Sequence, residues 1–143
     1  MPELAPILRE DVLQALSATN GVITVGAMQN MKKVDSFIKE TLRFYTLSPS
    51  SFMRKVLKTF TLSSGQVVPA GSVIELSAIG IYTDEDYFQD AEKFDALRFY
   101  RMRQTKAEQQ TGSKKAEVVA NSQAVSVGLT SLTFGYGRHA CPG

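Results

Sequence analysis

The sequence predicts an α+β fold in which helices come first, a small sheet follows, and a long polar segment leads to a glycine-flanked cysteine. Two segments, 3–16 and 26–45, repeat apolar residues at helical spacing. Between residues 50 and 82, apolar strand-like runs are separated by turn residues. The segment 101–123 is polar and lysine-rich, so it is expected to be a solvated loop.

The two helical segments each present one apolar face. In the first segment that face contains Leu4, Ile7, Leu8, Val12 and Leu16. Asn20-Gly21 predicts the end of this helix, because both residues favour turn conformations. The second stretch is expected to end before Ser48-Pro49, since a residue that precedes proline avoids helical backbone. Its apolar face contains Val34, Phe37, Ile38, Leu42 and Tyr45.

A β hairpin is expected after these helices. Ser51 to Val56 can alternate faces as one strand, and Ser72 to Tyr82 is apolar enough for a second, half-buried strand. Turn residues stand between them at 63–65 and at 69–71. A short helical turn is expected from Thr83 to Asp86, where early acidic residues suit the positive end of the helix dipole.

The composition limits the classes of function. A chain of 143 residues with 43% hydrophobic and 21% charged residues is typical of one globular domain. The net charge of +2 is too small to indicate a nucleic-acid partner or an anionic membrane surface. One cysteine excludes an intramolecular disulfide. No apolar run reaches the length of about 18 residues that a membrane span needs, so no membrane anchor is expected in this chain.

The most specific motif is the run FGYGRHACPG at 134–143, which places the only cysteine behind an aromatic residue and between glycines. A lone cysteine is by itself most often an inert, buried, small hydrophobe, so Cys141 alone leaves both interpretations open. Together, Phe134, Gly137, Cys141 and Gly143 resemble the haem-binding loop of the cytochrome P-450 superfamily. That loop has the pattern Phe-x-x-Gly-x-Arg-x-Cys-x-Gly.

A second motif lies on the second helical stretch. Glu40 and Arg43 are three residues apart, which by itself indicates no more than an ordinary surface ion pair. The family, however, has a Glu-x-x-Arg helix, a β hairpin, a Phe-x-Pro-x-Arg-Phe segment and the cysteine loop in this order. Here FDALRF at 94–99 takes the third place, with Ala96 where proline is usual. The resemblance therefore implies that Glu40, Arg43 and Arg98 form a buried structural triad.

The same resemblance implies roles for the residues of the cysteine loop. Cys141 would be the thiolate ligand of the iron in haem b, and Phe134 would form an apolar wall beside the sulfur. Gly137 suits a positive φ or a close approach of the porphyrin. His139, which stands where arginine is commonest, and Arg54 would donate hydrogen bonds to haem propionates. The alternatives are a solvent-facing loop histidine and a solvated strand arginine.

The fold class implied is an α+β fragment of the mainly-α P-450 fold, with two or more helices, a hairpin or small sheet, and a long meander that ends in the cysteine loop. The whole chain, 1–143, would be one partial P-450 domain. Its parts would be the helical region 1–47, the hairpin region 50–82, the short helix and meander 83–133, and the cysteine loop 134–143. The distal helix that delivers protons in the family is not found before Glu40, so no catalytic residue is expected here.

The function implied is that of a monooxygenase, which inserts one oxygen atom of O2 into a small organic substrate. Electrons would come from NAD(P)H through an NADPH-dependent reductase, and full-length relatives would lie on the cytosolic face of the endoplasmic reticulum membrane. The motif spellings resemble fungal members of secondary metabolism. The chain by itself is expected to be soluble, and its sequence does not identify a cellular compartment. The alternatives are a truncated, inactive chain that does not hold haem stably, and a small haem-binding or haem-sensing protein.

Overall fold

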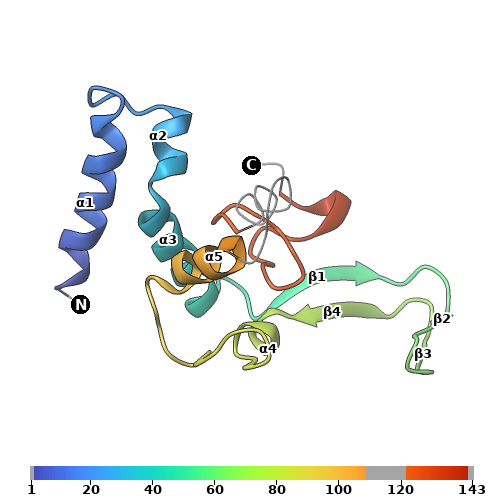
Figure 1. Cartoon of the computed structure of the whole chain (residues 1–143). Helices are drawn as coiled ribbons and strands as arrows, with labels where there is room; N and C mark the ends of the chain where they lie inside the picture. The colour runs from blue at the N-terminus through green and yellow to red at the C-terminus, as the bar shows by residue number, and fades with distance from the viewer. Residues whose placement is uncertain (1, 109–121, 142–143) are drawn as a thin grey trace. The chain divides into compact units, whose positions relative to one another are not determined.

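The computed structural model describes residues 2–108 and 122–141, which form five α-helices and two small antiparallel sheets (Figure 1). The chain divides into two units. The first unit contains Met1–Tyr45 and Glu92–Ser126, and the second contains Thr46–Ala91 and Val127–Gly143. Among the residues described, helices build the first unit and the strands lie in the second. The α+β composition predicted from the sequence is confirmed.

The first unit is built around α3 (Lys32–Phe44), which packs against α1 (Leu4–Ser17) and α5 (Arg98–Glu108). The predicted first helix is confirmed. After α1 the chain reverses through Asn20 and Gly21, whose φ angles are +51° and +81°. Both residue types reach this left-handed region more easily than others do, so the stop signal in the sequence has a conformational basis.

The single helix expected over residues 26–45 is wrong, because the helix is interrupted at Met31. The structure has α2 (Val25–Asn30), then Met31 with φ −76° and ψ +63°, then α3. The new helix start is stabilised from outside: the Asp11 Oδ2 atom on α1 accepts hydrogen bonds from the amides of Lys33 (2.8 Å) and Val34 (3.1 Å). A cap supplied by another helix leaves no signal in the local sequence.

The solvated loop expected from Arg101 to Gln123 is also wrong where the structure describes it. Residues 98–108 form α5, while 109–121 lie outside the described residues. Arginine, methionine, glutamine, lysine, alanine and glutamate all favour helix, so a polar composition did not exclude one. Two residues one turn apart, Phe99 and Arg103, are buried and supply the packing that stabilises the helix.

The second unit contains an antiparallel pair, β1 (Ser50–Lys55) and β4 (Val73–Ser77), which is extended by a small hairpin of β2 (Phe60–Thr61) and β3 (Val67–Val68) (Figure 1). The register pairs Ser50 with Ser77 and Lys55 with Val73. It shifts between Ser51 and Arg54, where Phe52 has a φ of +62°. A positive φ at a bulky residue marks this position as a β-bulge that turns the strand.

The half-buried strand expected from Ser72 to Tyr82 is wrong in extent and in burial. Strand β4 ends at Ser77, all of its residues are exposed, and the apolar residues that follow form a short helix, α4 (Ala78–Tyr82). Ser77 changes the conformation because its Oγ accepts a hydrogen bond from the Gly80 amide at 3.0 Å and so caps α4. One further hydrogen-bonded turn follows, in which the amides of Tyr87 and Phe88 donate to the Asp84 carbonyl.

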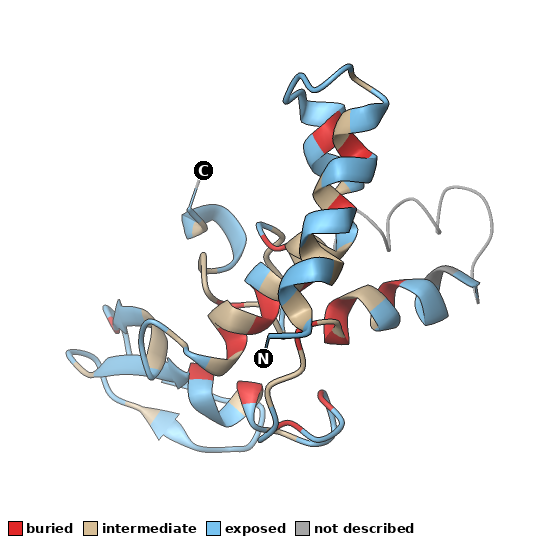
Figure 2. Ribbon diagram, turned by 90° about the vertical axis from the view of Figure 1, so that its left-hand side faces the viewer, coloured by how far each residue is buried: buried red, intermediate tan, exposed pale blue. Residues whose placement is uncertain are grey.

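Polar and charged side chains occupy many of the buried positions of the first unit. Figure 2 shows the buried residues in red. The buried residues of α3 are Ser36, Lys39, Glu40 and Arg43. Meanwhile the apolar side chains of Ile38 and Tyr45 are 45% and 65% exposed. Helix α3 therefore turns a polar face toward its neighbours in this unit. Among the described residues, no helix has both the length and the apolar character that crossing a bilayer requires.

Candidate functional site

Glu40 is the centre of a buried ionic network in the first unit. Its side chain is fully buried, and both carboxylate oxygens are occupied. Arg43, one turn further along α3, donates through Nε and Nη2 at 2.8 Å each, which is a bidentate pair. Arg98, at the start of α5, donates through Nε at 3.2 Å. The structure thus brings Arg98 to the neighbouring pair Glu40 and Arg43, from which it is 58 and 55 residues away in the chain.

The same network also holds main-chain groups of the segment before α5. The Asp95 amide donates to Glu40 Oε1 at 2.9 Å, and the Lys93 carbonyl accepts from Arg98 Nη2 at 2.9 Å. Such contacts matter, because a buried charge is costly unless the remaining lone pairs and protons are also satisfied. With its hydrogen bonds formed, the network fixes residues 93–98 onto α3.

Ser36, one turn before Glu40, is the other large contributor to this packing, and the sequence did not single it out. Its hydroxyl donates to the Ala96 carbonyl at 3.0 Å and accepts from the Tyr100 amide at 2.9 Å. The residue is completely buried. Spacing could have found it, because Ser36, Glu40 and Arg43 follow one another at intervals of four and three residues on one helical face.

The cysteine loop lies in the second unit and is held by its own backbone. The Cys141 amide donates to the Phe134 carbonyl at 2.7 Å, and the Ala140 amide donates to the Gly137 carbonyl at 3.0 Å. Gly135 and Gly137 have φ values of +79° and +66°, which favour glycine. The Cys141 thiol is exposed and forms no disulfide.

Space remains beside the loop. A Cβ atom added to Gly137 would have no heavy atom within 4 Å, and His139 is exposed on the same short turn. The Arg138 Nε atom donates to His139 Nε2 at a long distance of 3.4 Å. Phe134 is half-buried. The loop therefore presents a thiol and a histidine on an open glycine turn.

Two aromatic rings, those of Tyr136 and Phe52, connect the cysteine loop to Arg54. The Tyr136 ring of the loop packs edge-on against Phe52, with 6.3 Å between centroids. The Arg54 guanidinium lies 5.8 Å from the centroid of the same Phe52 ring, and its Nη1 donates to the Met53 carbonyl at 2.8 Å. The β-bulge that gives Phe52 its positive φ places this ring between the two residues.

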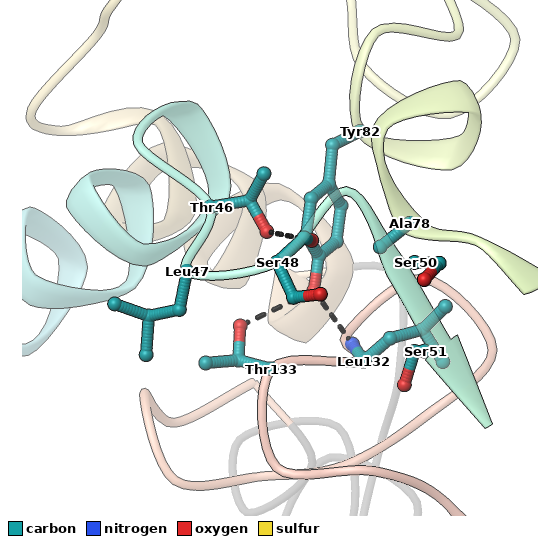
Figure 3. Close-up of a pocket in the computed structure, with 9 residues that line it drawn as sticks. All are labelled: Thr46, Leu47, Ser48, Ser50, Ser51, Ala78, Tyr82, Leu132 and Thr133. Carbon is teal, nitrogen blue, oxygen red and sulfur yellow. Dashed lines mark hydrogen bonds between the residues drawn. The ribbon is translucent and has the colours of Figure 1, made fainter. Parts of the chain in front are cut away.

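A small cavity lies behind the start of the cysteine loop (Figure 3). Its volume is about 60 Å3, and six of its nine lining residues carry a hydroxyl group. The Tyr82 hydroxyl accepts from the Leu132 amide at 2.8 Å and shares a hydrogen bond of 3.2 Å with the Thr133 hydroxyl. Tyr82 thereby ties the chain just before Phe134 to α4. The volume suits a few water molecules and is far below the several hundred Å3 of a pocket for an organic ligand.

Comparison with known proteins places the chain in a family. The family model described as Cytochrome P-450 matches residues 1–143. The chain belongs to the cytochrome P-450 family. Similar proteins are fungal: the cytochrome P-450 monooxygenase ATR3 of Stachybotrys chlorohalonatus is 38% identical over 143 residues. The monooxygenases terQ of Tolypocladium album and ltmQ of Epichloe festucae var. lolii are 40% and 42% identical over 142 residues.

The chain spans only about a quarter of the length of these P-450 relatives. The matches cover 99–100% of this chain, but 29% of ATR3 and 24% of each of the other two proteins. Membership of the family therefore extends over the whole sequence.

The donor set of the cysteine loop fits the haem of this family. A thiolate is the protein ligand that P-450 iron uses, and the Cys141 thiol is both exposed and uncommitted. The neighbouring Gly137 leaves open space where any other residue would carry a side chain. Arg54 and His139, the cation and the imidazole expected to contact propionates, are both exposed.

Proposed function

We propose that this chain is the haem- and iron-binding portion of a cytochrome P-450 monooxygenase, in which Cys141 would be the thiolate ligand to the iron of haem b. The observation that carries the proposal is an exposed, unpaired thiol on an open glycine turn, in a chain that belongs to this family. When bound, haem supplies the O2 chemistry by which one oxygen atom enters a small organic substrate and the other is reduced to water.

The loop residues have distinct tasks in this proposal. Cys141 acts as a thiolate, and the bond from its amide to the Phe134 carbonyl orients the residue. The Phe134 ring limits the access of water to the sulfur, which tunes a metal site. His139 and Arg54 donate hydrogen bonds to the haem propionates, and the His139 bond is strongest when the imidazole is protonated.

The network of Glu40, Arg43 and Arg98 has a structural role and does not touch reacting atoms. It holds the segment 93–98 on α3 through charge-assisted hydrogen bonds to main-chain groups.

The complete protein would take its electrons from NAD(P)H through a reductase, as the family does, and would lie on the cytosolic face of the endoplasmic reticulum membrane. The fungal source of the similar proteins favours a role in secondary metabolism. We expect the isolated 143-residue chain to show no turnover, because it spans only about a quarter of the length of the monooxygenases that it matches.

The test is the absorption spectrum of the reduced, CO-bound protein after expression with haem. A thiolate ligand gives a strongly red-shifted Soret band, and we expect this band in the unsubstituted protein and its loss in Cys141→Ser. Serine keeps the size of the side chain and isolates the effect of the sulfur. A chain that folds but retains no haem would favour the alternative of an inactive chain without a cofactor.

A further inference from the structure

Two residues of α3 outside the Glu40 network bind opposite ends of one peptide group. The Lys39 Nζ atom donates to the Gln123 carbonyl at 2.8 Å, and the Ala124 amide donates to Asp35 Oδ1 at 2.9 Å. That carbonyl and that amide belong to the same peptide bond. Asp35 and Lys39 are four residues apart and so lie on one face of α3, which lets them act as a clamp, here called the 35/39 clamp.

Charged groups from α5 complete the surroundings of the clamp. Arg103 Nη1 lies 2.8 Å from Asp35 Oδ2, with an ionic rather than a well-directed contact, and Arg103 Nη2 donates to the Lys32 carbonyl at 2.9 Å. The Lys39 ammonium lies 5.2 Å from the centroid of the Phe99 ring. Lys106, also on α5, is the other cation that acts on Lys39.

Keeping Lys39 charged in this place is costly. Burial is the main cause that lowers the pKa of Lys39 from 10.5 to about 8; the cations Arg103 and Lys106 contribute to this lowering, and the Asp35 carboxylate opposes it. Only 7% of the residue is exposed. A methionine would fill similar space without this cost, so stability alone does not explain a lysine at this position. What methionine lacks is the ability to hold the Gln123 carbonyl.

The Gln123–Ala124 peptide lies just before the chain passes from the first unit to the second. Ala124 is buried, and three residues later, at Val127, the chain enters the second unit on its way to the cysteine loop. We propose that Asp35 and Lys39 are positioning residues for the Cys141 loop, which act by fixing the Gln123–Ala124 peptide on α3. The inference rests on the proposed function, because it takes Cys141 as the ligand whose placement matters.

The first readout is hydrogen exchange at the Ala124 amide in the protein, which reports the clamp directly. Removing one charge-assisted hydrogen bond should accelerate exchange about 10- to 100-fold in Lys39→Met and in Asp35→Ala. Because both residues hold one rigid peptide group, the double variant should exchange no faster than the faster single variant.

Two matched controls separate the clamp from general effects. Lys32→Met removes an exposed lysine from the same helix and should leave exchange at Ala124 unchanged. Asp35→Asn keeps an acceptor for the Ala124 amide while removing the charge, so it should retain most of the protection. Unchanged exchange in both Lys39→Met and Asp35→Ala would overturn the clamp.

The second readout is the fraction of bound haem that gives the red-shifted Soret band in the reduced CO complex. We expect this fraction to fall several-fold in Lys39→Met without a fall in the melting temperature, and to stay constant in Lys32→Met. Faster exchange with an unchanged fraction would overturn the positioning role. Absence of the band from the unsubstituted protein would contradict the proposed function and with it the positioning role. Unchanged exchange in a protein that shows the band would overturn the clamp alone.

Discussion

Glu40 and Cys141 lie in regions that are stabilised in different ways. The Glu40 carboxylate is completely buried and accepts from two guanidiniums and one main-chain amide. The Cys141 loop is exposed, and its shape comes from backbone hydrogen bonds and two glycines with positive φ. Charge pairing therefore fixes one region, and backbone conformation fixes the other.

This difference separates structure from chemistry in the chain. A buried network can be weakened by removing one charge, because the remaining charges are then left without compensation. An exposed loop loses little stability when a side chain changes, yet its side chains remain available for a ligand. Substitutions in the Glu40 network should therefore lower mainly the stability, and side-chain substitutions in the Cys141 loop should affect mainly the binding of a ligand.

The largest expected effect is that of Glu40→Gln. This change leaves the guanidiniums of Arg43 and Arg98 buried with a neutral partner, which should lower the free energy of unfolding by about 3–5 kcal/mol. Denaturant unfolding measures it. Glu10→Gln is the control, because Glu10 is exposed and contacts only Gln14 among the bonds described for it. A loss below about 1 kcal/mol for Glu40→Gln would mean that the network does not stabilise the first unit.

The second effect is the pH dependence caused by Lys39. The pKa of Lys39 is about 8 in the folded chain, compared with the ordinary value of 10.5 that applies to the unfolded chain. Between these two pH values the unfolded chain therefore binds one more proton than the folded chain. The free energy of unfolding should therefore rise with pH over this window, by about 3 kcal/mol relative to Lys39→Met. Urea unfolding of both proteins from pH 7 to 11 measures the difference. Parallel pH profiles would contradict the burial of a charged lysine.

A pair of glycine substitutions should change stability in opposite directions. Gly137→Ala forces a residue with a Cβ to adopt a φ of +66°, which costs about 1–2 kcal/mol. Gly26 lies in α2, and a Cβ atom added there would be 3.9 Å from Thr24 Oγ1, an ordinary contact distance. Gly26→Ala should therefore stabilise the chain by about 0.5–1 kcal/mol. Thermal unfolding of both variants measures the contrast. Equal effects would show that backbone conformation does not define the loop.

The smallest expected effect on stability is that of Cys141→Ser in the absence of haem. The thiol is exposed and unpaired, so the free energy of unfolding should change by less than about 0.5 kcal/mol. The same variant should lose the thiolate spectrum entirely. A stability loss of about 2 kcal/mol or more would instead identify the sulfur as a packing group.

The sequence predicted those parts of the fold that depend on local turn residues or on the order of motifs along the chain. The motif order led to Glu40, Arg43 and Arg98 being considered together, and Asn20-Gly21 marked the end of α1. It did not predict the break at Met31, the burial of Ser36 and Lys39, or the contact of Asp35 with Ala124, because these depend on partners more than 20 residues away in the chain. Polar residues on a helix are usually assigned to solvent, and here they face main-chain groups instead.

The most direct test of the account is the iron-edge X-ray absorption of the haem-loaded protein, because it identifies the atoms bound to iron. We expect one sulfur neighbour in addition to the porphyrin nitrogens, and its disappearance in Cys141→Ser while the Glu40 network remains folded. A wild-type spectrum with only nitrogen or oxygen neighbours would contradict the assignment of Cys141 as the ligand.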